Sequence, residues 1–217
     1  MPATVSDHSL VKRQFQIFER ALKKFKSDVD LWIQYIQVAK REGARTLIGK
    51  VVARYDMKIS GRDGMTLTCA YRALQLHPNV PALYILGAAH EVENQSPSAA
   101  RTLLQRGLRV NKESIELWTE YVRMEIGFAE TMGRRWSVLG IDAREEEREI
   151  MEGGIAAAAV RHAVAAGGGE AVSAIEMMIE EIGAGTAGLR RVAGELACLR
   201  RQERGSVGVK HAEGHEN

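Results

Sequence analysis

Apolar residues recur along this chain at intervals of three and four positions, the spacing of an α-helix that buries one face. Residues 96–125 follow this pattern clearly and predict two helices joined by a short turn. Ser96 is a favourable N-cap for the first helix, and Pro97 is tolerated in a first turn because its missing N–H would have no partner there. A new apolar stripe begins at Ile115 and predicts the second helix. Two helices joined by so short a turn must lie antiparallel.

The same helix pair recurs, with a small residue in its first helix 11 positions before an aromatic residue in its second. The occurrences are Ala21 with Trp32, Ala73 with Tyr84, and Gly107 with Trp118, and Tyr35 and Tyr121 follow two of the aromatic residues by three positions. We expect these residues to form the cores of the repeats, with Trp118 buried. The recurrence predicts an all-α fold of antiparallel helix pairs, stacked as a right-handed α-solenoid with essentially no strand.

The repeats are unevenly spaced. The step from Tyr84 to Trp118 is 34 residues, but the step from Trp32 to Tyr84 is 52, an excess of 18. A helix is expected from Ala44 onward, and residues 55–72 then contain the run Ser-Gly-Arg-Asp-Gly, which interrupts helices. The codons permitted at the two ends of this segment include an in-frame splice donor and acceptor. We therefore interpret residues 55–72 as an insertion or a retained intron, with a functional loop as the alternative.

The domain organisation follows from a change in composition after residue 141. Residues 8–141 are predicted to form the repeat array, and residues 142–204 a C-terminal helical segment with helices over residues 171–182 and 189–204. The three consecutive glycines at 167–169 are interpreted as a linker, because the residues after them do not fit a phosphate-binding loop. Residues 205–217 are expected to be a disordered tail.

Charge is distributed unevenly between these parts. Residues 1–141 hold 21 Lys or Arg against 14 acidic residues, whereas residues 142–217 hold 9 against 14. Residues 10–25 form the first predicted helix, with Phe25 on its apolar face, and Ser27 is expected to cap the next helix. The basic residues on and beside this helix are possible contacts for RNA phosphates: Lys12, Arg13, Lys23, Lys24 and Lys26. A solvated helix face is the alternative, because no aromatic stacking platform is interleaved with them.

No catalytic constellation is found. Cys69 and Cys198 lack partners at zinc-ligand spacing, and neither His77 nor His90 has a positioned nucleophile. No metal, cofactor or enzymatic activity is therefore expected, and the function is predicted to be binding. The chain has no apolar run long enough for a membrane span and no secretory signal at residues 1–7, so cytosol or nucleus is the expected compartment.

Several ordered runs give a specific resemblance. They are Ile-Phe-Glu-Arg-Ala-Leu at 17–22, Leu-Tyr-Ile-Leu at 83–86 with His-Glu at 90–91, residues 96–109, Glu-Leu-Trp at 116–118, Arg-Arg-Trp at 134–136 and Leu-Gly-Ile at 139–141. Over about residues 8–164 the chain resembles the U3 small nucleolar RNA-associated protein 6 family, which is built from half-a-tetratricopeptide repeats. The chain differs from the family by its 18 extra residues and by the absence of a helical segment before the first repeat, as in an imperfect gene model or a fragment.

The resemblance implies a non-catalytic scaffold of the small-subunit processome, located in the nucleus and nucleolus. Its implied partners are other processome proteins, and U3 small nucleolar RNA or ribosomal RNA precursor contacted directly or through the complex. Membranes are not among them. Two alternatives are a repeat module that binds RNA through its basic helix face and an adaptor of another RNA-processing complex.

Overall fold

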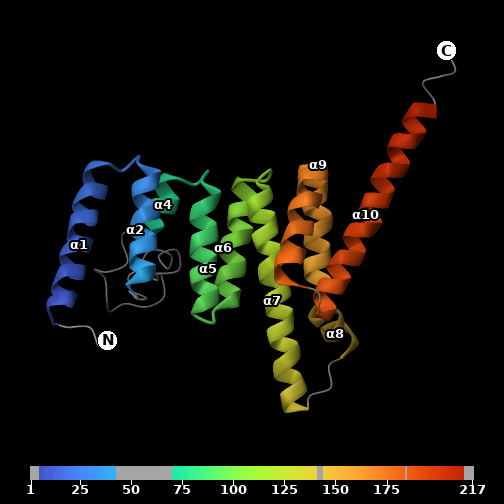
Figure 1. Ribbon diagram of the computed structural model, residues 1–217, viewed down its shortest axis with the longest axis horizontal. Helices are drawn as coiled ribbons and strands as arrows, with labels where there is room; N and C mark the ends of the chain where they lie inside the picture. The colour runs from blue at the N-terminus through green and yellow to red at the C-terminus, as the bar shows by residue number, and fades with distance from the viewer. Residues whose placement is uncertain (1–4, 43–69, 141–143, 184, 213–217) are drawn as a thin grey trace. The chain divides into compact units, whose positions relative to one another are not determined.

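A computed structural model describes residues 5–42, 70–140, 144–183 and 185–212 (Figure 1). Its elements are α1 (Val5–Lys24), α2 (Val29–Arg41), α4 (Ala70–Leu76), α5 (Pro81–Glu93), α6 (Pro97–Val110), α7 (Ile115–Leu139), α8 (Glu145–Met151), α9 (Gly154–Ile182) and α10 (Ala187–Ala212). The predicted all-α fold of helix pairs is confirmed for these ranges, which contain no strand. The helix expected from Ala44 and residues 55–69 of the predicted insertion lie outside the described residues, and residues 70–72 begin α4.

The chain divides into two compact units, Met1–Leu103 and Leu104–Asn217. This division differs from the boundary predicted after residue 141. The reason is that α7 packs against α9 within the second unit, so helices on both sides of residue 142 share one core. Composition changes at that point, but the apolar stripe of α7 packs against α9, which lies further along the chain.

In the first unit, α1 and α2 pack against each other through aromatic side chains. Phe15 meets Tyr35 edge to face with ring centres 6.0 Å apart, and Phe18 lies 5.5 Å from the same ring. Figure 1 shows the two helices joined by a short turn. Asp28, rather than the predicted Ser27, caps α2, because its side chain accepts a hydrogen bond of 3.1 Å from the Leu31 N–H.

The second helix pair of this unit consists of α4 and α5, which contact each other. Pro81 opens α5 at a position where no N–H donor is required. The buried residues of this pair recur at helical spacing: Ala73, Leu74, Leu83, Tyr84, Gly87, Ala88 and His90. The turn before α5 reaches back to the first pair, because Nε2 of His77 lies 2.8 Å from the carbonyl oxygen of Lys26.

In the second unit, α7 buries one stripe over its first four turns and then leaves the core. Its buried residues are Leu117, Tyr121, Val122, Glu125, Ile126 and Ala129. Beyond them Val138 and Leu139 are exposed, at 86% and 67% of their surface. Gly140 ends the helix in the left-handed conformation at φ 61°, which glycine adopts without steric cost.

The glycine run at 167–169, predicted as a linker, joins two helical segments of α9. Gly168 adopts φ 53° and ψ −138°, so α9 consists of two helical segments that meet at a sharp kink (Figure 1). The predicted linker is thus a single non-helical residue. Both segments bury apolar residues, including Val160 and Ile175.

The last helix differs from the sequence prediction at its end. A disordered tail was expected from residue 205, but α10 continues to Ala212. Its first turns pack on α9 and α7, and Leu189, Val192 and Leu196 are buried at helical spacing. Gly188, near its start, approaches Gly153 so closely that a Cβ built on Gly153 would lie 2.8 Å from the Cα of Gly188.

Candidate functional site

The predicted repeat-core residues have different environments. Trp32, Tyr35, Ala73, Tyr84, Gly107 and Tyr121 are buried, whereas Ala21 and Trp118 are half-buried. Trp118, expected to be buried, is thus only partly buried. Its ring stacks with that of His162 on α9, with ring centres 6.2 Å apart and planes inclined by 17°, and His162 is itself exposed.

The two tryptophans nevertheless occupy equivalent local structures in the two units. The indole N–H of Trp32 donates to the carbonyl oxygen of Lys26 at 3.1 Å, and that of Trp118 donates to the carbonyl oxygen of Lys112 at 3.0 Å. Each tryptophan lies four positions after the N-cap of its helix. The N–H partner satisfies the polar end of a large apolar side chain, which supports the repeat assignment at atomic level.

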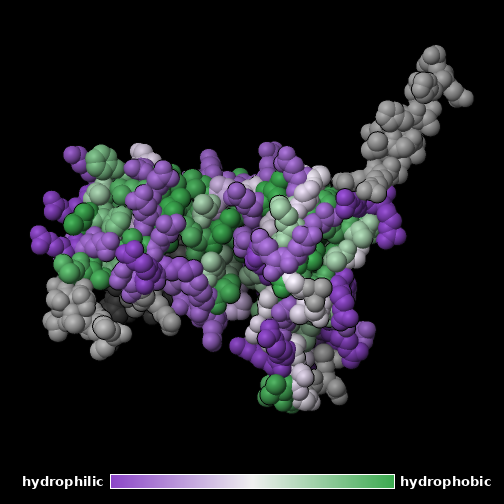
Figure 2. Space-filling view, viewed as in Figure 1, coloured by the Kyte–Doolittle hydropathy of each residue, from purple (hydrophilic) through white to green (hydrophobic). Residues whose placement is uncertain are grey.

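The basic residues singled out from the sequence lie together on α1 and at its end. We call the α1 stripe its five exposed cations: Lys12, Arg13, Arg20, Lys23 and Lys24. At 100° per residue they span an arc of about 120° around the helix. Glu19 lies just outside this arc and is half-buried. Lys26 is exposed in the turn that follows, and Figure 2 shows hydrophilic residues, with apolar ones among them, along the outer edge of α1.

The cations of the α1 stripe lie in one row and form no ion pairs with described acidic residues. Within the described ranges, none of its cations has an acidic partner within ion-pair distance. Six arginines of the second unit do have such partners: Arg123, Arg134, Arg148, Arg161, Arg191 and Arg200. The positive charge of the stripe is thus not neutralised by the described part of the protein.

Phe25 is a residue of this surface that the sequence analysis assigned to the core. Phe25 is 54% exposed and lies just after α1, which ends at Lys24. The amino group of Lys24 lies 5.5 Å from the centre of the Phe25 ring. The signal that could have revealed its position is the start of α2 at Val29, which leaves residue 25 in the turn.

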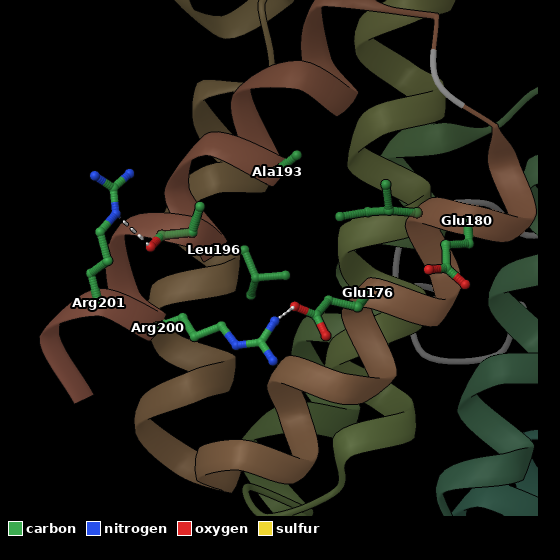
Figure 3. Close-up of a pocket in the computed structure, with 8 residues that line it drawn as sticks. Glu176, Glu180, Ala193, Leu196, Arg200 and Arg201 are labelled. Carbon is green, nitrogen blue, oxygen red and sulfur yellow. Dashed lines mark hydrogen bonds and ion pairs between the residues drawn. The ribbon is translucent and has the colours of Figure 1, made fainter. Parts of the chain in front are cut away.

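A groove of about 470 Å³ lies between α9 and α10 (Figure 3). Apolar residues including Ile179 and Leu196 line it, with Glu176 and Glu180 contributed by α9 and Arg200 and Arg201 by α10. Arg200 is paired with Glu176 at 2.7 Å.

The histidines and carboxylates of the first unit make structural contacts. His90 is buried, and its Nε2 lies 2.7 Å from Nδ2 of Asn94. Burial raises the pKa of Glu91 above its ordinary value.

Over the described ranges, no cluster of three or more His, Cys, Asp or Glu is arranged to hold a metal ion. None of the described helices combines the length and apolar content that a membrane span requires.

Comparison with known proteins gives a consistent result. The chain is 30% identical over 151 residues to U3 small nucleolar RNA-associated protein 6 of Schizosaccharomyces pombe, covering 69% of this chain and 27% of that protein. The human homolog is 30% identical over 156 residues, covering 69% and 23%. The mouse homolog is 35% identical over 127 residues, covering 58% and 18%. This chain is a relative of U3 small nucleolar RNA-associated protein 6.

The resemblance inferred from the ordered runs is thus confirmed. The chain spans about a quarter or less of the length of these U3 small nucleolar RNA-associated proteins. No protein-family model matches it. Among solved structures, the crystal structure of MamA aligns with 95% of this chain and 99% of that chain, at 12% identity and a TM-score of 0.42, a similarity too small to say more.

Proposed function

We propose that the chain is a non-catalytic scaffold of the U3 small nucleolar ribonucleoprotein and the small-subunit processome. In this role it acts in the nucleolus, in ribosomal RNA processing and in small ribosomal subunit biogenesis. The observation that carries the proposal is its similarity, at 30–35% identity, to proteins named for their association with U3 small nucleolar RNA.

The geometry supports a binding role. Each unit forms its core from paired helices, and the outer faces of these helices are left for partners. Described surfaces that could contact partners include the α1 stripe, the exposed end of α7 and the groove between α9 and α10. They offer charge and apolar contact rather than reactive groups.

Affinity purification of the tagged full chain from cells tests the proposal. We expect other processome proteins and U3 small nucleolar RNA to co-purify, and a fluorescent fusion to concentrate in the nucleolus. Treating the extract with ribonuclease before purification separates protein contacts from tethering by RNA. A scaffold keeps its protein partners after this treatment. Recovery of a different RNA-processing complex, or of no proteins at all, would contradict the proposal.

A further inference from the structure

We infer that α1 and the turn after it bind single-stranded RNA directly, with the α1 stripe holding phosphates and the Phe25 ring stacking on one base. This inference goes beyond the proposed scaffold role, which needs only protein contacts. It names a ligand class and the residues that contact it. Its two supports are the unneutralised charge of the stripe and the exposed ring at the end of the stripe.

The first step of the argument concerns the charge. Lys12 and Lys24 are 12 residues apart, so the stripe extends about 18 Å along the helix. Lys23 and Lys24 also stabilise the negative end of the helix dipole, which is a structural reason for their presence. Lys12, Arg13 and Arg20 lie away from that end of the helix, and they form no ion pair among the described residues. Cations left exposed in one row are suited to a ligand with repeated negative charges.

The second step concerns the ring, which decides between kinds of ligand. Proteins that bind single strands combine a basic surface along the backbone with aromatic rings on which bases stack. Phe25 is an aromatic residue that is 54% exposed, with Lys23, Lys24 and Lys26 next to it in the chain. The Lys24 amino group lies over the ring, 5.5 Å from its centre, so a phosphate bound by Lys24 is held next to this aromatic side chain and a base has the opposite face of the ring to stack on. An acidic peptide would use the cations but has no need of the ring.

The third step concerns the acidic residues nearby. Asp28 follows Phe25 by three residues, but its carboxylate accepts the Leu31 N–H and serves as the cap of α2. Glu19 is half-buried at the edge of the stripe. The path from Lys12 to Lys24 therefore has no exposed carboxylate on it.

The test measures binding of the full chain to a fluorescent 12-nucleotide oligouridine and to an RNA duplex of equal length, over a salt series. We expect tighter binding of the single strand, with a slope of log K against log salt that becomes less steep by about 2 in the triple variant Lys12→Gln, Arg13→Gln, Arg20→Gln. The matched control neutralises three exposed cations of the second unit, Lys112, Arg135 and Arg190, each to Gln. This control should leave the slope unchanged.

Phe25 variants separate stacking from charge. Phe25→Ala and Phe25→Leu should each weaken single-strand binding by roughly 5- to 150-fold, whereas Phe25→Trp should retain it. Circular dichroism of every variant should show the wild-type helix content and thermal midpoint, because all positions are exposed. Equal loss in the control triple, full affinity in Phe25→Leu, or binding of polyglutamate through the same residues would each overturn the inference. If this inference fails, the proposed scaffold role is still tested separately, by co-purification of processome proteins after ribonuclease treatment.

Discussion

Trp32 and Trp118 have the same position in the repeat but different burial, so they should contribute differently to stability. Trp32 is 2% exposed, and Trp32→Ala should cost about 3–5 kcal/mol through lost apolar contact and a cavity. Trp118 is half-buried under His162, and Trp118→Ala should cost about 1–3 kcal/mol. Urea unfolding of the two variants measures both. A larger loss for Trp118→Ala would contradict the described packing.

Glu91 is the residue for which a pH dependence follows from the structure. Burial raises its folded-state pKa above 4.5, so ionising this side chain at neutral pH lowers the stability of the folded protein. The stability contributed by the protonated side chain is present below pH 4.5, and it is lost as the pH rises through the folded-state pKa. Glu91→Gln should therefore raise the thermal midpoint at pH 7, and the difference from wild type should vanish below pH 4.5.

The control for this prediction is Glu113→Gln, because Glu113 is an exposed glutamate in the turn between α6 and α7. It should leave the midpoint nearly unchanged at both pH values. A stability gain of Glu91→Gln that persists at pH 4 would mean that the amide stabilises the fold by some other contact.

At this scale the sequence predicted which residues form the cores more reliably than where helices begin and end. Periodicity places Trp32 and Tyr84 inside because each lies within a helix with a continuous apolar face. Phe25 fits the same period but lies one residue past the end of α1, where the period no longer applies. The cap of α2 shifted from Ser27 to Asp28 for a related reason, since both residue types cap well and the backbone decides between them.

At the scale of elements, the contact between the start of α9 and the start of α10 depends on two glycines with different constraints. Gly153 has φ 88°, and a Cβ there would lie 2.8 Å from the Gly188 Cα, so Gly153→Ala is strained in both respects. Gly188→Ala places its Cβ 3.8 Å from the Gly153 Cα, an ordinary contact. We expect a loss of about 1–3 kcal/mol for the first and little change for the second. Thermal unfolding of the pair checks this.

The elements themselves show what periodicity can and cannot predict. The helices expected at 171–182 and 189–204 appear as the second segment of α9 and the first part of α10. The glycines between the α9 segments signalled a break, but only the backbone shows that it is confined to Gly168. Four of the ion pairs described in the second unit join residues 24 to 58 positions apart, and a helical period does not predict such pairs.

At the scale of the whole molecule, the uneven repeat spacing gives a prediction about residues 55–72. Deleting them restores a 34-residue step between Trp32 and Tyr84, equal to the next step. The shortened protein should be at least as stable as the full chain, because an insertion outside the repeat pattern contributes loop-closure cost of a few kcal/mol at most. Chemical denaturation compares the two forms. Genomic DNA without a splice donor and acceptor at the ends of this segment would rule out the intron.

The division into two units is the property of the whole chain that sequence patterns missed. Repeats of similar length suggest a uniform array up to residue 141, yet the units divide at residues 103 and 104, where the helical pattern of α6 is unbroken. The apolar stripe of one helix does not identify the distant helix that covers it. For α7 that partner is α9, which follows the change in composition.

Because the chain divides into two units, tryptophan fluorescence can report on the unfolding of each unit separately. The chain has three tryptophans, and replacing Trp136 with Phe leaves Trp32 to report on the first unit and Trp118 on the second. Fluorescence from the buried indole should be emitted at shorter wavelength than that from the half-exposed one. A single denaturation series then yields two unfolding curves, and separate midpoints would mean that each unit melts as its own cooperative body.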